Sequence, residues 1–362
     1  MINKKSHTAA SLGITSENIV SKENIRFYDV KAIDTFRIYG LWNARLEPRF
    51  MRIPACIGDN TNPGVKGLNY QTAGGRVRFV TTSRYVAVKT TNAGPANMTN
   101  MDIIGSSCFD VYMRVNGRET FTGVLKPAVS SWKNGFDAIL GLPEGVKEIT
   151  INFPLYHGVT DLYIGLDKTS SLTKHPDYKF EKPVLYYGSS ITQGGCASRP
   201  GMCYEAIISR RLDTNYRNLG FSGSAKAEDI MIGYLATQDC SVFVLDYDHN
   251  APTDEHLANT HEKLYLEFRK THPETPVIMV GKPDFWLTAG ASPLNRREII
   301  YNTYWNAKER GEKVIFIDGY SLFHGELREE CTVDGCHPND LGMSRMADVI
   351  GKAVDMALSG RL

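Results

Sequence analysis

The spacing of hydrophobic and polar positions changes near the middle of the chain. Up to about residue 166, apolar side chains recur at every second position in short runs, which is the period of half-buried strands. Residues 109–115 alternate in this way and lead into Asn116-Gly117, a dipeptide typical of a tight hairpin turn. Further runs predict strands at residues 76–80, 85–89, 148–153 and 162–164. Many short strands without helices predict an all-β sandwich of jelly-roll type over residues 25–166.

Beyond residue 183, short apolar runs alternate with longer segments of helical period. The runs predict five strands, at residues 184–187, 216–219, 242–246, 277–280 and 314–317. Apolar side chains repeat every three to four residues in 256–270 and from about 341 onward, which predicts amphipathic helices. Strands joined by crossover helices predict a parallel sheet with helices on both sides. Ligands of such sheets bind beyond the carboxyl ends of the strands.

Two polar segments delimit these halves. Residues 1–24 have no regular pattern and predict an N-terminal tail or strap. Residues 167–182 are polar, contain Pro176, and predict a linker. We therefore expect a sandwich domain over 25–166 and an α/β domain over 183–362, in line with the two domains that a length of 362 residues favours.

Charge and composition narrow the classes of partner. The net charge of +1 favours neither nucleic acid nor an anionic membrane as a partner. No apolar run approaches the roughly 20 residues that a membrane-spanning helix needs. The basic N-terminus is not followed by an apolar core, so we expect a cytoplasmic protein, or a periplasmic or secreted one if a leader precedes this sequence.

Seven cysteines are too few for a disulfide scaffold. Cys196 and Cys203 lie close in sequence, as do Cys331 and Cys336. These pairs leave two alternatives open, namely separate reduced thiols or disulfides, of which a Cys331–Cys336 bond would brace the turn at Asp334. Cys196 and Cys203 are farther apart than the gap of two to four residues common between zinc cysteines, and Cys331 and Cys336 are at its upper limit, so we expect no metal or organic cofactor.

The residues with the clearest chemical pattern are an acid and a histidine near the C-terminus. Asp334 and His337 are three residues apart, in a run where Gly335 and Pro338 disfavour a helix. The carboxylate can hold the imidazole in one tautomer, which leaves the other ring nitrogen free as a base. Ser190 follows the first strand of the α/β half on a turn beside Gly188. Together these residues predict acyl transfer through a serine nucleophile, most simply by an esterase.

The next two strands of the α/β half also end in residues suited to this chemistry. The second ends in a glycine-containing loop, residues 218–224, whose backbone N–H groups can approach an oxyanion. The third is followed by Asn250, whose side chain can donate to the same oxyanion. Asp246, Asp248 and His249 on this segment leave open a metal site or, alternatively, caps for the following helix.

The order and spacing of these blocks resemble the SGNH (GDSL-like) hydrolase superfamily, over residues 183–362. The resemblance implies that Ser190 is the nucleophile and that Asp334 and His337 complete the triad. It also implies an oxyanion hole made by the N–H groups of Ser190 and Gly223 and the side chain of Asn250. Three positions depart from the family pattern: Ser189 and His249 stand where Asp and Gly are usual, and Ala251 where a second Asp is usual.

The resemblance further implies a flavodoxin-like fold with a five-stranded parallel sheet, and a two-domain subgroup in which a β-sandwich precedes it. Similar carbohydrate esterases are implied to remove acetyl groups, so an acetylated sugar or another small ester is the expected substrate. Trp286, after the fourth strand, could stack on a sugar ring or pack against the sandwich. Two alternatives remain: a general short-chain esterase or lysophospholipase, and a glycan-binding protein with a vestigial hydrolase domain. The complete set of Ser190, His337 and Asp334 favours an enzyme.

Overall fold

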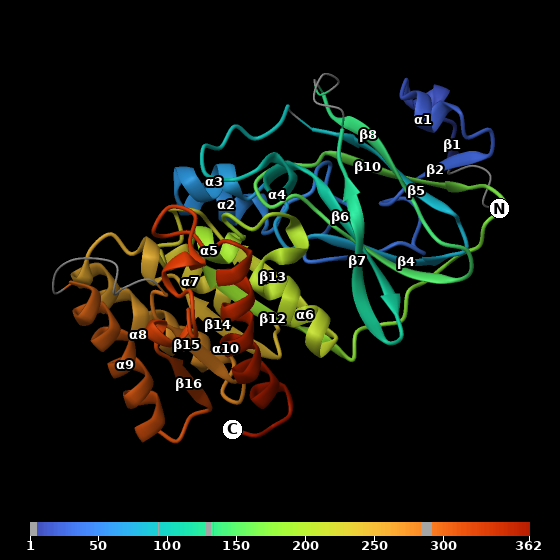
Figure 1. The fold of residues 1–362 in the computed structure, drawn as a ribbon. Coiled ribbons are helices and arrows are strands. Elements are labelled where there is room, and N and C mark those ends of the chain that lie inside the picture. The colour runs from blue at the N-terminus through green and yellow to red at the C-terminus, as the bar shows by residue number, and fades with distance from the viewer. Residues whose placement is uncertain (1–5, 93, 128–131, 133, 284–291) are drawn as a thin grey trace. The chain divides into compact units, whose positions relative to one another are not determined.

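The computed structural model describes residues 6–92, 94–127, 132, 134–283 and 292–362, and divides the chain into two compact units (Figure 1). The sandwich unit comprises Met1–Arg52, Tyr70–Asp177 and Arg199–Gly201. The α/β unit comprises Ile53–Asn69, Tyr178–Ser198 and Met202–Leu362.

The sandwich unit consists of two antiparallel sheets. The first has the strand order β1-β2-β10-β5-β8, and the second has the order β11-β4-β9-β6-β7 with β3 paired to β4. The strands of the first sheet are β1 (Ser6–His7), β2 (Ile25–Asp29), β10 (Asp161–Asp167), β5 (Tyr85–Thr91) and β8 (Phe136–Gly141). Those of the second are β11 (Leu172–Thr173), β4 (Arg76–Thr81), β9 (Lys147–Asn152), β6 (Phe109–Val115), β7 (Arg118–Leu125) and β3 (Arg37–Tyr39).

The core of this unit follows from the two-residue period. Val86 and Val88 of one sheet and Ile149 and Ile151 of the other are fully buried in one shared cluster. The predicted hairpin connects β6 to β7, and Asn116 and Gly117 both adopt the positive φ angles, 50° and 79°, that a type I′ turn requires. The predicted strands and the antiparallel sandwich are therefore confirmed.

Helices interrupt the region that the sequence predicted to be without them. α2 (Ala55–Thr61) and α3 (Pro63–Leu68) form a helical pair, and α4 (Ile103–Ser107) precedes β6. Asn62 caps α3, since its side-chain oxygen accepts a hydrogen bond from the Val65 N–H at 2.9 Å. Val65 is fully buried in the core of the α/β unit. The pair is rich in Gly, Asn and Pro, which conceals the helical period.

The two polar segments are also more ordered than their patterns indicate. Residues 6–24 contain β1, a short 3₁₀ helix (Ala10–Leu12) and α1 (Glu17–Val20), and Ile14 and Ile19 are buried in a small cluster with Phe27. In the expected linker, β11 pairs with β4, and β12 begins at Phe180. Single apolar residues in polar surroundings anchor these segments, and periodicity does not detect them.

The α/β unit is built on five parallel strands in the order β13-β12-β14-β15-β16, which is the 2-1-3-4-5 order of flavodoxin-like folds. Its strands are β12 (Phe180–Gly188), β13 (Thr214–Gly220), β14 (Val242–Asp246), β15 (Val277–Val280) and β16 (Val314–Ile317). Its other helices are α5 (Ser190–Gln193), α6 (Tyr204–Leu212), α7 (Asp229–Ala236), α8 (Asp254–Thr271), α9 (Ser292–Glu309) and α10 (Asp340–Leu358). Short 3₁₀ helices span Asp248–Asn250, Gly319–Ser321 and Glu329–Cys331, and a further one, Pro200–Met202, begins in the segment that belongs to the sandwich unit.

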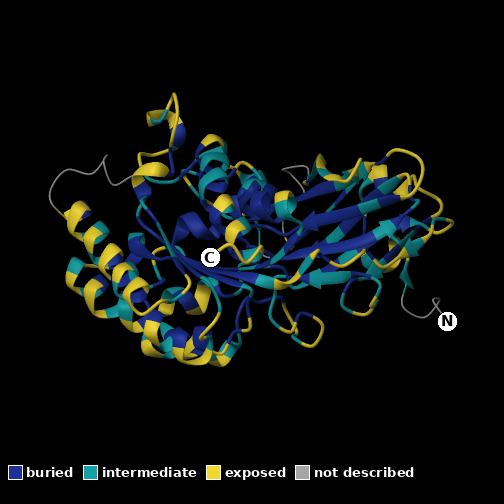
Figure 2. Cartoon of the chain, turned by 90° about the horizontal axis from the view of Figure 1, so that it is seen from below, coloured by how far each residue is buried: buried dark blue, intermediate teal, exposed yellow. Residues whose placement is uncertain are grey.

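The parallel sheet is buried on both faces, as its near-continuous apolar strands require. Leu185, Leu245 and Met279 share one cluster with residues of α7, α8 and α9. Figure 2 shows that the strands are buried while exposed positions lie on the outer faces of the helices and on loops. No helix in the described ranges has both the length and the apolar character needed to cross a membrane. The strand order reverses between β12 and β14, and a flavodoxin-like sheet binds ligands at this point.

Candidate active site

Ser190 begins a short helical turn directly after β12. Its neighbour Ser189 caps this turn, because the Ser189 hydroxyl accepts a hydrogen bond from the Ile191 N–H at 3.1 Å. Gly194 ends the turn with a φ of 101°, a left-handed conformation that favours glycine. The departure at Ser189 from the family pattern therefore retains a local hydrogen bond that orders the turn.

Two glycines allow the strands to approach this turn closely. A Cβ on Gly188 would lie 2.0 Å from Thr192 Oγ1, and one on Gly220 would lie 2.2 Å from the backbone nitrogen of Gln193. Two non-bonded atoms cannot come this close, so a side chain at either position would displace the turn. The ends of β12 and β13 therefore pack directly against the segment that carries Ser190.

The predicted serine, histidine and aspartate form one continuous chain of hydrogen bonds. Ser190 Oγ lies 2.9 Å from His337 Nε2, and His337 Nδ1 lies 2.8 Å from Asp334 Oδ2. The other carboxylate oxygen of Asp334 accepts from the backbone N–H groups of Cys336 and His337, at 3.1 and 2.8 Å. With Nδ1–H donated to the carboxylate, Nε2 can accept the serine proton.

The turn that carries Asp334 and His337 is held at its base. The Val333 N–H donates to the His337 carbonyl at 2.9 Å, and Gly335 adopts a φ of 79° between them. Asn339 then caps α10 by accepting from the N–H groups of Leu341 and Gly342. Since both ends of the turn are bonded, the backbone places the acid and the imidazole next to each other.

The loops after β13 and β14 are bonded to the serine turn and to each other. The Phe221 N–H donates to the Gly188 carbonyl at 2.9 Å, and the Ser222 N–H donates to Gln193 Oε1 at 3.0 Å. The Asn250 side-chain amide, 8% exposed, donates one N–H to the Phe221 carbonyl at 2.8 Å. That bond orients the amide and leaves its second N–H as a donor.

Gly223 is the exposed residue at the tip of the loop after β13 and has a φ of 64°. Within the described residues, its backbone N–H bonds no acceptor. Ser224 and Ala225 close the turn around it by donating to the Phe221 carbonyl at 2.8 and 3.1 Å. The loop thus presents a fixed, unoccupied backbone donor.

The acids on the β14 segment bond protein donors. Asp246 Oδ2 accepts from Thr192 Oγ1 and from the Tyr204 hydroxyl, each at 3.0 Å. Complete burial raises the pKa of Asp246 to about 7 against the lowering effect of these hydrogen bonds. Asp248 accepts from the Arg296 guanidinium at 2.8 Å and from the Lys282 N–H at 2.9 Å. The helix cap that follows is Thr253. These contacts support a structural role for both acids, behind and beside the serine turn.

All seven cysteines are free thiols, so neither sequence-adjacent pair forms a disulfide. Cys196 lies two residues after Gly194 with a φ of 71°, and its side chain is close to Asp334 and His337. Burial, and secondarily the charge of Asp334, raises the pKa of the Cys196 thiol to about 12. Sequence spacing gave no indication of this cluster, because Cys196 is remote from Asp334 along the chain.

The helical pair α2–α3 is a second feature that the sequence did not indicate. Asn62 donates to the Ser224 carbonyl at 2.9 Å, one residue from Gly223. A Cβ on Gly64 would lie 1.9 Å from Ser224 Oγ. The pair therefore supports the loop that carries the Gly223 donor. Trp286, the candidate sugar contact, lies outside the described residues.

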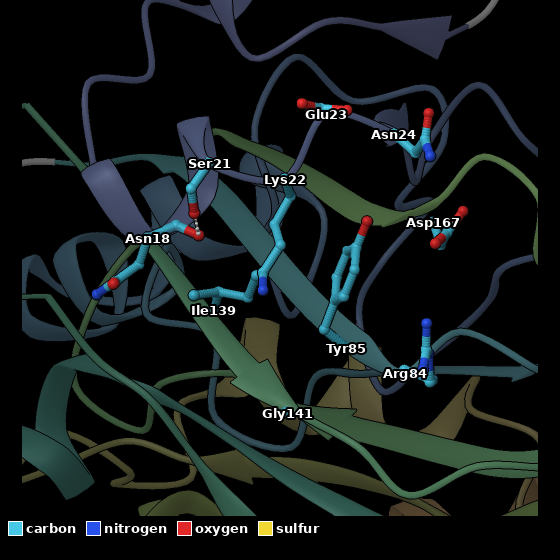
Figure 3. Close-up of a pocket in the computed structure, with 10 residues that line it drawn as sticks. All are labelled: Asn18, Ser21, Lys22, Glu23, Asn24, Arg84, Tyr85, Ile139, Gly141 and Asp167. Carbon is cyan, nitrogen blue, oxygen red and sulfur yellow. Dashed lines mark hydrogen bonds between the residues drawn. The ribbon is translucent and has the colours of Figure 1, made fainter.

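The sandwich unit contains a separate open hollow of about 680 Å³ (Figure 3). Tyr85 lies at its centre, with Lys22 Nζ 5.7 Å from the ring centroid. Burial, and secondarily Asp167, raises the pKa of the Tyr85 hydroxyl to about 12. Ile139 and Gly141 also line the hollow. Its remaining lining residues are polar or charged: Asn18, Ser21, Glu23, Asn24, Arg84 and Asp167.

The flavodoxin-like sheet with these loops at its switch point is the arrangement expected of an SGNH-type ester hydrolase, and comparison with known families shows that class. The model of the GDSL-like lipase/acylhydrolase family matches residues 181–355. The model of the N-terminus of SGNH-hydrolase-type esterases matches residues 25–172. The chain belongs to the SGNH (GDSL-like) hydrolases, in the subgroup with an N-terminal sandwich.

Solved structures have a similar fold. A Bacteroides ovatus protein described as a GDSL-like lipase is 27% identical, with a TM-score of 0.83 over 93% of this chain and 98% of that one. A salicylyl-acyltransferase from a tetracycline biosynthetic pathway is 18% identical, with a TM-score of 0.76 over 94% and 99% of the two chains. A family two carbohydrate esterase from Clostridium thermocellum, solved with cellohexaose, is 14% identical, with a TM-score of 0.56 over 79% and 93%. No curated protein sequence matches the chain significantly.

Proposed function

We propose that this ester hydrolase acts through a Ser190–His337–Asp334 triad and removes O-acetyl groups from carbohydrate. The observation that carries the triad is the unbroken chain of hydrogen bonds, at 2.9 and 2.8 Å, from the serine hydroxyl through the imidazole to the carboxylate. A serine, a base and an orienting acid at these distances are the requirements for nucleophilic catalysis.

In the first half of the reaction, Ser190 Oγ attacks the ester carbonyl carbon while His337 Nε2 takes its proton. The negative oxygen of the tetrahedral intermediate receives hydrogen bonds from the Gly223 N–H, the second N–H of Asn250, and the Ser190 N–H. As the intermediate collapses, the ester C–O bond breaks and His337 gives its proton to the departing alcohol. Water, activated by the same imidazole, then attacks the acyl-serine and releases the acid.

The oxyanion donors are expected to make the largest single contribution to the rate enhancement over the uncatalysed reaction. Loss of one such donor typically lowers kcat by about 10²–10³, or roughly 2.7–4 kcal/mol. Asn250 is suited to the role because its amide is already oriented by the Phe221 carbonyl and reorganises little during the reaction. The Gly223 donor is held by a turn closed on the same carbonyl.

The carbohydrate substrate is supported by the likeness in fold to a family two carbohydrate esterase solved with cellohexaose. The direct experiment measures acetate released from acetylated xylo-, manno- and cello-oligosaccharides, beside nitrophenyl acetate, butyrate and octanoate. Sharp restriction to acetyl esters, with faster release from a sugar than from nitrophenyl acetate, supports the deacetylase. Equal or faster turnover of butyrate and octanoate contradicts it and favours a general short-chain esterase or lysophospholipase.

A glycan-binding protein with an inactive hydrolase unit is the second candidate, and the hollow around Tyr85 favours it. An aromatic ring beside polar side chains of both charges can stack on a sugar and hydrogen-bond its hydroxyls. Oligosaccharide binding and ester turnover of wild type and Tyr85→Ala distinguish the two candidates. If wild type shows no turnover but binds oligosaccharide, and Tyr85→Ala does not bind it, the binding role is supported. Turnover that Tyr85→Ala retains supports the enzyme.

A further inference from the structure

The turn with the acid and the histidine brings together three different metal-ligating side chains. The Cys196 sulfur, an Asp334 oxygen and a His337 nitrogen all lie within 4.8 Å of one another. Thiolate sulfur, imidazole nitrogen and carboxylate oxygen are the three ligand types that zinc takes in proteins. The cluster belongs to one unit but is assembled from two segments of the chain that are remote in sequence.

A second thiol and a second imidazole adjoin this cluster. Cys336 lies between Asp334 and His337 in the chain, and its sulfur is 3.9 Å from His249 Nδ1. Cys336 is also close enough to Cys196 for the two thiols to interact electrostatically. A soft divalent cation at the cluster would therefore have further sulfur and nitrogen atoms beside it.

We propose that Cys196, Asp334 and His337 bind a zinc ion that switches the esterase off. This inference rests on the proposed role of His337 as the base. Both nitrogens of this imidazole are in use in the hydrogen-bonded chain, Nε2 with Ser190 and Nδ1 with Asp334. An ion on Nε2 takes the lone pair that accepts the serine proton. An ion on Nδ1 holds the imidazole proton on Nε2, with the same consequence.

The geometry requires only small movements. In a tetrahedral zinc site, with bonds of about 2.0–2.3 Å, the ligand atoms lie roughly 3.3–3.6 Å apart. Separations near the upper bound of 4.8 Å must therefore shorten by about 1 Å, and the 2.8 Å between His337 Nδ1 and Asp334 Oδ2 must lengthen by less than 1 Å if the ion binds Nδ1. Asp334 is exposed and His337 half-exposed on a turn, while Cys196 is buried. Binding releases the thiol proton to solvent and leaves the imidazole neutral, so the step needs no oxidant or reductant.

The test compares zinc inhibition of wild type, Cys196→Ser and a matched control, Cys56→Ser. Cys56 is an exposed thiol on α2, which tests for binding to surface cysteines in general. Each protein is measured against its own zinc-free turnover of nitrophenyl acetate. We expect inhibition of wild type and Cys56→Ser that a chelator reverses, and a half-inhibitory concentration that is about tenfold or more higher for Cys196→Ser. Equal inhibition of all three proteins overturns the proposal.

A measurement of metal binding that does not depend on ester turnover tests this inference separately from the proposed function. Cobalt(II) replaces zinc in such sites and gives a thiolate-to-metal absorption band. The Ser190→Ala variant should show this band, and Ser190→Ala combined with Cys196→Ser should lose it. A band in both proteins, or in neither, contradicts the metal site whether or not the wild type hydrolyses esters. If the band depends on Cys196 but the wild type has no esterase activity, the metal ligands are supported and the proposed catalytic role of His337 is refuted.

Discussion

Asp246 should make the stability of the chain depend on pH in an unusual direction. Its carboxyl group is completely buried at the end of β14, where burial raises its pKa from 3.8 to about 7. Below pH 3.8 the group is protonated in both the folded and the unfolded chain. As the pH rises through about 7, the folded chain must hold a buried carboxylate. Between pH 3.8 and about 7, the carboxyl group is deprotonated in the unfolded chain but still protonated in the folded chain. The folded state therefore binds more protons over this range, and stability falls as pH rises.

The magnitude follows from the separation of the two pKa values. From 3.8 to about 7 is roughly three pH units, and at 1.36 kcal/mol per unit the loss is roughly 4 kcal/mol. This is an upper limit, since relaxation of the interior reduces the penalty. Asp246→Asn stays neutral and keeps one oxygen to accept from Thr192 and Tyr204. We expect its stability relative to wild type to rise between pH 4.5 and 8 by an amount approaching this limit.

Urea unfolding of both proteins at several pH values in this range measures the difference. The matched control is Asp239→Asn, since Asp239 is an exposed partner of Lys182 and should change stability by less than about 0.5 kcal/mol at every pH. A difference between Asp246→Asn and wild type that is constant with pH, or that decreases as pH rises, would refute the reasoning.

Three further variants test the supports of the site. Asn250→Ala should lower kcat for nitrophenyl acetate by about 10²–10³ through loss of an oxyanion donor, and a fall below fivefold would contradict that role. Gly220→Ala should lower both turnover and thermal stability, because its Cβ would lie 2.2 Å from the Gln193 nitrogen. Gly233→Ala is the control that should retain both, because its Cβ would meet no atom within 4 Å apart from its chain neighbours and its own helix backbone. Asn62→Ala should cost about 1 kcal/mol or more in urea unfolding through loss of the α3 cap, and unchanged stability would argue against it.

The strands, and the serine, histidine and aspartate that the structure joins by hydrogen bonds, were predictable because their signals are local. A two-residue period records one buried face, and β6 and its hairpin begin and end where the alternation does. Asp334 and His337 lie on one turn, and Ser190 follows a strand whose carboxyl end must face the same edge of the sheet. Each of these features can be recognised within about ten residues of sequence.

The missed features depend on contacts between distant segments. The helices α2 and α3 contain glycine, asparagine and proline, and gain their burial from the core of the α/β unit. Cys196 meets Asp334 and His337 only in the folded chain. Asp246 looks like any acid at a strand end, and its raised pKa comes from the depth at which β14 ends. Local patterns carry no information about any of these three environments.

The most direct test of the central claim identifies the residue that carries the acyl group. Wild type, Ser190→Ala and His337→Ala are mixed with nitrophenyl acetate, quenched in acid within one turnover, and mapped by peptide mass spectrometry. The account predicts one acetyl group on the peptide of Ser190 in wild type, and none there in Ser190→Ala. Acetyl on another residue, such as Cys196 or Cys336, or continued turnover by Ser190→Ala, would contradict the assignment of Ser190 as the nucleophile.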